Sequence, residues 1–164
     1  MTRALLEVDA VTKRFGGFVA LSEVSLAVRS GERLGIIGPN GSGKTTLINC
    51  ICGSLRSDGG SIGFDGIDVT RFAAYQRTRL GIARSFQVPR PFSSMTLAEN
   101  VAVPLEYVTH GRSLHGADVS AGARSILAQM GLADRADAPT GSLTQVDLRK
   151  LELARARWRS ARAC

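Results

Sequence analysis

The sequence predicts an α/β fold with a β-rich first half and a helical second half. Residues 38–45, GPNGSGKT, form a glycine-rich loop of the phosphate-binding type between a short apolar run and a segment of helical length. Apolar positions alternate before this loop, whereas they recur at helical spacing later in the chain. We therefore expect two lobes: residues 1–88, which are β-rich and carry the loop, and residues 89–156, which are helical.

The first half is expected to contain strands around one helix. Residues 4–15, ALLEVDAVTKRF, alternate imperfectly and end at a Gly-Gly turn, and residues 24–28 alternate as a half-buried strand does. After a turn, RLGII at 33–37 is expected to be a short buried strand. Residues 44–55 have helical length with Gly53 as a stop signal, and Asp65-Gly66 predicts a hairpin turn in SIGFDGIDV.

The second half predicts helices separated by loops. Residues 80–83 are a short apolar strand candidate, followed by a proline-interrupted loop. Thr96 and Glu99 form a capping box that opens a helix through about Tyr107, which Pro104 keeps short or kinked. After a polar linker, a second helix closed by Gly131 has one apolar face, formed by Val119, Ala123, Ile126, Leu127 and Met130.

Composition limits the classes of protein to consider. With 164 residues, 44% of them hydrophobic, the chain can form one cored domain with a small second lobe. No apolar run of about 18 residues and no signal peptide is present, so we expect a cytoplasmic protein. The net charge of +7 is dispersed and aromatics are only 5%, which favours a solvated basic surface over nucleic-acid binding. We expect packing thiols and not a zinc site at Cys50, Cys52 and Cys164.

The glycine-rich loop is expected to bind a nucleoside triphosphate. Its glycines let successive N–H groups point inward, and the following helix N-terminus adds partial positive charge. Lys44 can bridge the outer phosphates, and the Thr45 hydroxyl can bind Mg²⁺. A chance glycine turn between a strand and a helix is the alternative. The candidate binding residues are Gly38, Pro39, Asn40, Gly41, Ser42, Gly43, Lys44, Thr45 and Thr46.

Three stretches together resemble the ATP-binding subunit of ABC transporters: KRFGG with Phe15, GPNGSGKTT, and Ser85-Phe86-Gln87. The resemblance implies a P-loop NTPase of the ABC nucleotide-binding type, with an N-terminal antiparallel β subdomain, a helical subdomain, ATP and Mg²⁺. It also implies that Phe15 stacks on adenine, and that Gln87 has a catalytic role and senses Mg²⁺ and the attacking water. The alternatives are a core phenylalanine and a solvated loop glutamine.

A narrower resemblance links the chain to the branched-chain amino-acid importer group. It rests on LLEVDAVTKRFGGFVAL, GIARSFQVPRPF and MTLAENVAVPL, and it runs from about Leu5 to Ala156. This likeness implies transmembrane permease subunits and a second ATP-binding subunit as partners, at the inner face of the plasma membrane. Whether the two ATP-binding subunits are identical stays open, and the cargo follows from likeness to the group alone.

The family's LSGGQ signature is replaced here by other residues. The matching positions are Leu143, Thr144, Gln145, Val146 and Asp147. In the family this segment presents a serine hydroxyl and glycine N–H groups to the nucleotide of the opposite subunit. Val146 places a branched side chain where close approach favours glycine. An ordinary helix with Thr144 as its N-cap is the alternative interpretation.

The family pattern breaks off after LELARA. No buried strand ending in Asp-Glu and no switch histidine follows, and His110 and His115 lie in a polar linker before the signature. A two-base slip near Ala156 would turn the expected continuation into residues 157–164, so we expect an out-of-frame tail and a core whose C-terminal part is missing. A natural alternative C-terminus and a sequencing error stay open.

These departures predict a chain that is poorly soluble or partly unfolded and that does not hydrolyse ATP by itself. Losing about a third of such a domain would expose apolar faces of the remaining sheet. Two alternative functions stay open: a non-catalytic nucleotide-binding remnant of a disrupted gene, and an ABC-type ATPase that does not act in transport.

Overall fold

A computed structural model describes residues 4–86, 88–108 and 116–157 of the chain. It divides into two compact units, Met1–Ile82 and Ala83–Cys164. Gln87, His110, His115, Cys164 and most of the predicted out-of-frame tail lie outside the described residues.

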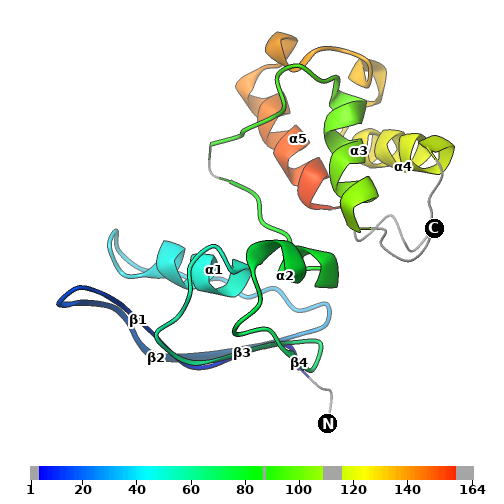
Figure 1. The fold of residues 1–164 in the computed structure, drawn as a ribbon. Helices are drawn as coiled ribbons and strands as arrows, with labels where there is room; N and C mark the ends of the chain where they lie inside the picture. The colour runs from blue at the N-terminus through cyan, green and yellow to red at the C-terminus, as the bar shows by residue number, and fades with distance from the viewer. Residues whose placement is uncertain (1–3, 87, 109–115, 158–164) are drawn as a thin grey trace. The chain divides into compact units, whose positions relative to one another are not determined.

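The first unit is an antiparallel sheet covered on one side by two helices (Figure 1). The strand order is β2-β1-β3-β4. The strands are β1 (Ala4–Phe15), β2 (Phe18–Arg29), β3 (Gly59–Phe64) and β4 (Ile67–Asp68), and the helices are α1 (Lys44–Cys52) and α2 (Ala74–Leu80). The core of this unit is formed by apolar residues of β1, β2, β3 and α1, together with the residue that follows β4: Val8, Val11, Leu21, Leu47, Cys50, Ile51, Ile62, Phe64 and Val69.

Most local predictions for this unit are confirmed. The strand predicted over residues 4–15 is β1, and the alternating residues 24–28 fall in β2. Gly53 ends α1 in the left-handed conformation with φ 77°. Asp65 and Gly66, with φ 50° and 75°, form the turn that pairs Phe64 with Ile67.

Two predicted strands are wrong. RLGII at 33–37 has no regular structure, and Ile37 is 98% exposed. An apolar strand of this kind needs neighbours that hydrogen-bond to it and cover its faces, and no strand follows Asp68 in the described part of the chain. The second wrong strand is the one predicted at 80–83. Leu80 is the last residue of α2, a helix that the sequence did not predict. Gly81 ends this helix, and its N–H donates to the carbonyl of Arg77.

The second unit is helical, with α3 (Leu97–Val108), α4 (Gly116–Gln129) and α5 (Gln145–Ala156). Two short 3₁₀ turns, η1 (Ala133–Arg135) and η2 (Thr140–Ser142), join α4 to α5. Its core is formed by one face of each helix and the turns between them: Leu97, Val101, Leu105, Val119, Ala123, Ile126, Leu127, Leu132, Ala136, Leu151 and Ala154.

The capping box that was predicted for α3 is confirmed. The Glu99 carboxylate accepts the Thr96 N–H at 2.8 Å, and the Thr96 hydroxyl oxygen accepts the Glu99 N–H at 3.2 Å. Pro104 lies inside this helix, which runs to Val108. The apolar face predicted for residues 119–130 is also confirmed, since its members are buried in the core or pack against it.

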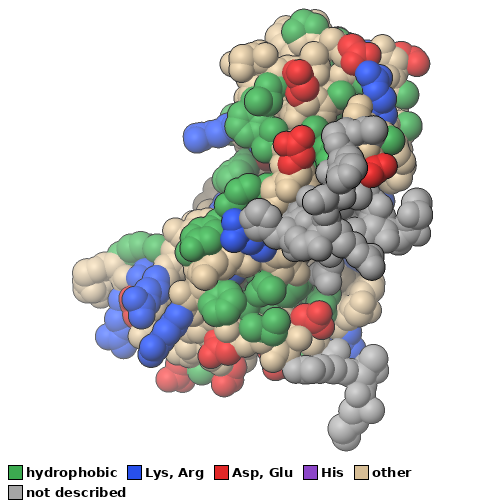
Figure 2. Space-filling view, turned by 45° about the vertical axis from the view of Figure 1, so that its right-hand side comes forward, with side chains coloured by type: hydrophobic (Ala, Val, Ile, Leu, Met, Phe, Trp, Pro, Cys, Tyr) green, Lys and Arg blue, Asp and Glu red, His purple; other side chains and the backbone are tan. Residues whose placement is uncertain are grey.

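Charged side chains of both signs reach the surface on the face drawn in Figure 2. Lys and Arg side chains lie there at several separate places, and acidic and hydrophobic side chains are exposed on the same face. Among the described residues, no helix is both long and apolar enough to cross a membrane.

Candidate nucleotide-binding site

The glycine-rich loop connects β2 to α1 and leads directly into the helix. Gly41 and Gly43 have φ of 83° and 84°, which L side chains rarely adopt, and Gly43 is the N-cap of α1. The first turn of α1 carries no acidic side chain. Its N-terminal N–H groups and their partial positive charge are therefore not offset by a carboxylate in that turn.

The Lys44 ammonium folds back over the loop. Its Nζ lies 2.7 Å from the Gly38 carbonyl, 2.6 Å from the Pro39 carbonyl and 3.2 Å from the Ser42 hydroxyl. The positive charge is thus held at the loop itself, at the start of α1. Thr45, in the first turn, is exposed, and Thr46 is half-buried. A triphosphate would meet the ammonium and the helix N–H groups here, and a Mg²⁺ ion would meet a hydroxyl oxygen.

The loop packs tightly against β2. A Cβ added to Gly43 would lie 2.5 Å from the Ala20 carbonyl oxygen and 2.9 Å from Leu21 Cδ2. A Cβ on Gly38 would lie 2.8 Å from the Ser42 hydroxyl. At Gly43 a side chain would meet the β2 backbone, so the close approach of the loop to β2 depends on this glycine. At Gly38 the neighbour is the Ser42 hydroxyl of the loop itself, which can rotate away.

Phe15 lies at the end of β1, directly opposite Phe18 across the hairpin turn. The two residues are 49% and 63% exposed, so Phe15 is not the core phenylalanine of the alternative interpretation. The Lys13 Nζ lies 5.5 Å from the centre of the Phe15 ring. An exposed aromatic ring of this kind can stack on a base.

The signature-like residues form the start of α5. Thr144 is the N-cap, as in the alternative interpretation: its hydroxyl oxygen accepts the Asp147 N–H at 3.2 Å. The same hydroxyl donates to Asp147 Oδ2 at 2.9 Å. Gln145 and Val146 are exposed, whereas Leu143 packs against the helical core.

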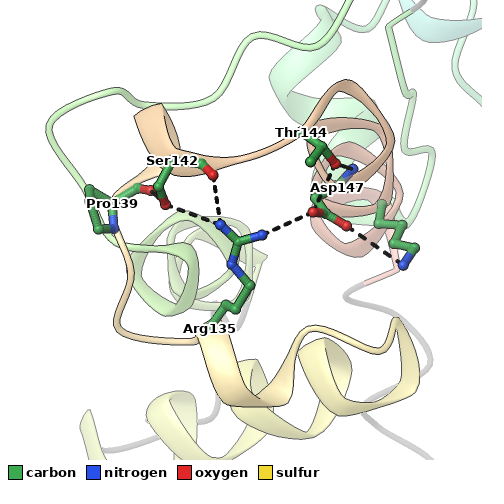
Figure 3. A network of polar contacts seen from close by, with 6 residues as sticks. Arg135, Pro139, Ser142, Thr144 and Asp147 are labelled. Carbon is green, nitrogen blue, oxygen red and sulfur yellow. Dashed lines mark hydrogen bonds and ion pairs between the residues drawn. The ribbon is translucent and has the colours of Figure 1, made fainter.

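Arg135 joins this helix start to the preceding turn (Figure 3). Its guanidinium lies 3.0 Å from Asp147 Oδ2 and donates to the Ser142 carbonyl at 2.7 Å. The pKa of Asp147 is lowered, first by the hydrogen bond from Thr144 and then by the charges of Lys150 and Arg135. The carboxylate is therefore ionised at neutral pH and paired with cations.

Sequence reasoning missed two carboxylates that the structure brings next to predicted site segments. Glu152 on α5 is 6% exposed, and it accepts the N–H of Phe86 at 3.2 Å. Asp58, between α1 and β3, binds the end of β1 beside Phe15. Glu152 lies within the LELARA stretch and Asp58 lies in no motif, but their partners are 66 and about 45 residues away in the sequence, so no local signal pointed to these contacts.

Comparison with known proteins identifies the family. A sequence model described as ABC transporter matches residues 21–163. The chain belongs to the ABC transporter family. The predicted family resemblance and the α/β fold class are thereby confirmed, and the solved structures that the chain resembles are themselves ATP-binding cassettes.

The similar curated proteins carry transport names. The chain is 36% identical to the probable branched-chain amino acid transport ATP-binding protein LivG of Archaeoglobus fulgidus, and the alignment covers 96% of the chain. It is 34% identical to the high-affinity branched-chain amino acid transport ATP-binding protein BraF of Pseudomonas aeruginosa, over 94% of the chain. The chain spans 65% of the length of each of these relatives.

Solved structures give the same result for the fold. An ATP-binding cassette of an ABC transporter superposes with a TM-score of 0.82 at 33% identity, covering 97% of this chain and 66% of that structure. A bacterial ABC transporter cassette solved as a dimer has a TM-score of 0.82 at 26% identity, covering 94% and 70%.

Proposed function

We propose that this chain is the ATP-binding, energy-coupling subunit of an ABC importer for branched-chain amino acids. The observation that carries the proposal is the loop at 38–46, whose lysine ammonium lies over the loop at the start of a helix without acidic residues in its first turn. The names of the similar proteins support the cargo.

Different residues of the first unit would bind different parts of the nucleotide. The loop N–H groups and the α1 N-terminus would hold the phosphates, and Lys44 would turn from the loop carbonyls to the outer phosphate oxygens. The Thr45 hydroxyl would bind Mg²⁺, which neutralises phosphate charge when bound. Phe15 would stack on the adenine. Gln87 is not part of the first unit and lies outside the described residues; its role in sensing Mg²⁺ and the attacking water stays a prediction from the sequence.

The partners follow from the same assignment. A second ATP-binding subunit would approach the signature-like residues 143–147 with its own nucleotide, and permease subunits would hold the assembly at the inner face of the plasma membrane. A cassette similar to this chain was solved as a dimer, which supports pairing. Nucleic acid is not among the partners that we propose.

We further propose that these 164 residues bind Mg-ATP without turning it over. The sequence contains no Asp-Glu pair, and a carboxylate that polarises the attacking water is what hydrolysis by this family's route needs. The role of a non-catalytic nucleotide-binding protein is therefore the alternative for this chain. Binding without phosphate release would favour it.

Thermal unfolding with and without Mg-ATP tests the proposal. A ligand present at 100 times its Kd stabilises the folded state by about 2.7 kcal/mol, so wild type should melt at higher temperature with the nucleotide. Lys44→Ala should lose this shift. Arg56→Ala removes the same charge from an exposed position just beyond α1 and should keep it. Equal shifts in wild type and Lys44→Ala would refute the assignment of the loop.

A further inference from the structure

We propose that Asp58 and Lys13 are positioning residues that set the Phe15 ring for stacking on the base of the nucleotide. This inference rests on the proposed function and deepens it, because it gives Asp58, which lies in none of the motifs, a part in base recognition. Three groups carry it: a carboxylate, an ammonium and an aromatic ring, all within the first unit.

Asp58 fastens the end of β1 with both of its carboxylate oxygens. Oδ1 accepts from Lys13 Nζ at 2.9 Å, and Oδ2 accepts the backbone N–H of Arg14 at 2.7 Å. The Asp58 N–H in turn donates to the Thr12 carbonyl at 2.8 Å. Three consecutive residues of β1 are therefore bound by one aspartate, immediately before Phe15.

Lys13 links Asp58 to the Phe15 ring, because its ammonium contacts both. Its side chain is only 12% exposed, so it is held and not free in solvent. Its Nζ lies over the Phe15 ring, 5.5 Å from the centre, which is a cation–π distance. Although the ammonium lies over the ring, Phe15 is still half exposed, so part of the ring is open to a planar base.

The hairpin lies where a bound nucleotide would need it. Lys13 is paired with Leu21 across the two strands, and Leu21 and Ala20 are the residues against which Gly43 of the phosphate loop packs. The hairpin turn and the loop before α1 extend toward the same end of the unit (Figure 1). One nucleotide can therefore reach both the loop and the ring.

Comparing two ligands separates base recognition from phosphate binding. Mg-ATP and inorganic tripolyphosphate both fit the loop, but only ATP has a base. Titration calorimetry of the full chain should show that Asp58→Ala weakens ATP roughly tenfold and tripolyphosphate less than twofold, because base stacking contributes on that scale. Asp65→Asn, which removes the same charge from a turn in the same unit, should change neither affinity.

A double variant then tests whether Asp58 acts through the ring. Phe15→Ala should weaken ATP at least as much as Asp58→Ala, and adding Asp58→Ala to Phe15→Ala should cost no more than twofold further. Equal loss of both ligands in Asp58→Ala, or losses that multiply in the double variant, would overturn the inference. Lys13→Met gives the same comparison if Asp58→Ala does not fold. Failure of wild type to bind tripolyphosphate would instead refute the proposed function.

Discussion

The guanidinium of Arg77 donates a 2.6 Å hydrogen bond to the Cys50 carbonyl and so closes the C-terminal end of α1. Arg77 is 2% exposed, and it also donates to the carbonyls of Ile51, Thr70 and Phe72 at 2.9 to 3.0 Å. One buried cation therefore satisfies carbonyls from the end of α1 and from the segment that leads to α2.

Replacing Arg77 with methionine should destabilise the chain by about 3 kcal/mol or more, because several buried carbonyls would lose their donor. Urea-induced unfolding followed by circular dichroism measures the change. Arg79→Met removes the same group from an exposed position of the same helix and should cost less than about 1 kcal/mol. Equal losses in the two variants would show that the buried contacts of Arg77 contribute nothing.

Two glycines of the glycine-rich loop allow the cost of backbone strain to be measured apart from the cost of steric contact. Gly41 and Gly43 have nearly the same φ, but a Cβ on Gly43 would meet the Ala20 carbonyl whereas one on Gly41 meets nothing within 4 Å. Both alanine variants should lose about 1–2 kcal/mol from strain. Gly43→Ala should lose roughly 1–3 kcal/mol more from the clash, again measured by urea unfolding. Equal losses would mean that the loop can move away from β2.

Local signals explain what the sequence predicted well. The glycine-rich loop, the Thr96 capping box and the Asp65-Gly66 turn each follow from residue types within a few positions. The capping box appears as hydrogen bonds, and the loop and the turn appear as positive backbone φ angles. The apolar face of α4 was readable for the same reason. Such features depend on neighbours in the sequence and not on distant partners.

Long-range contacts explain what was missed. RLGII has the composition of a buried strand, but composition does not supply the neighbouring strands that such a segment needs. The helix α2 was missed because its stabilising residue, Arg77, acts through carbonyls up to 27 residues away. Asp58 and Glu152 also act across long sequence separations, which a linear pattern cannot show.

Asp147 makes the start of α5 sensitive to acid. Its pKa is lowered in the folded state, chiefly by the hydrogen bond from Thr144. The stabilisation is therefore present above the unfolded pKa of about 3.9, and it is lost as pH falls through the lower folded value. The melting temperature of Asp147→Asn should lie below that of wild type at pH 7, and the difference should shrink as pH falls below 4.

The exposed pair of Arg124 and Asp137 provides the control for this effect. Their side chains are 2.6 Å apart but 50% and 74% exposed, so Asp137→Asn should change the melting temperature little at either pH. A difference for Asp147→Asn that stays constant from pH 7 to pH 3 would contradict a role for the ionised carboxylate. It would point to shape or packing of the side chain instead.

The exposed apolar segment at 33–37 should limit solubility. Ile37 is 98% exposed, and Leu34 and Ile36 are 47% and 38% exposed, so together they offer an apolar surface to other molecules. Ile37→Thr should reduce self-association, seen by light scattering over a range of concentrations, and change the unfolding free energy by less than about 0.5 kcal/mol. Ile62→Thr, at a fully buried position, should cost about 2–4 kcal/mol. If Ile37→Thr destabilised the chain as much as Ile62→Thr, residue 37 would have to be buried in solution. That result would support the buried strand that the sequence predicts for residues 33–37.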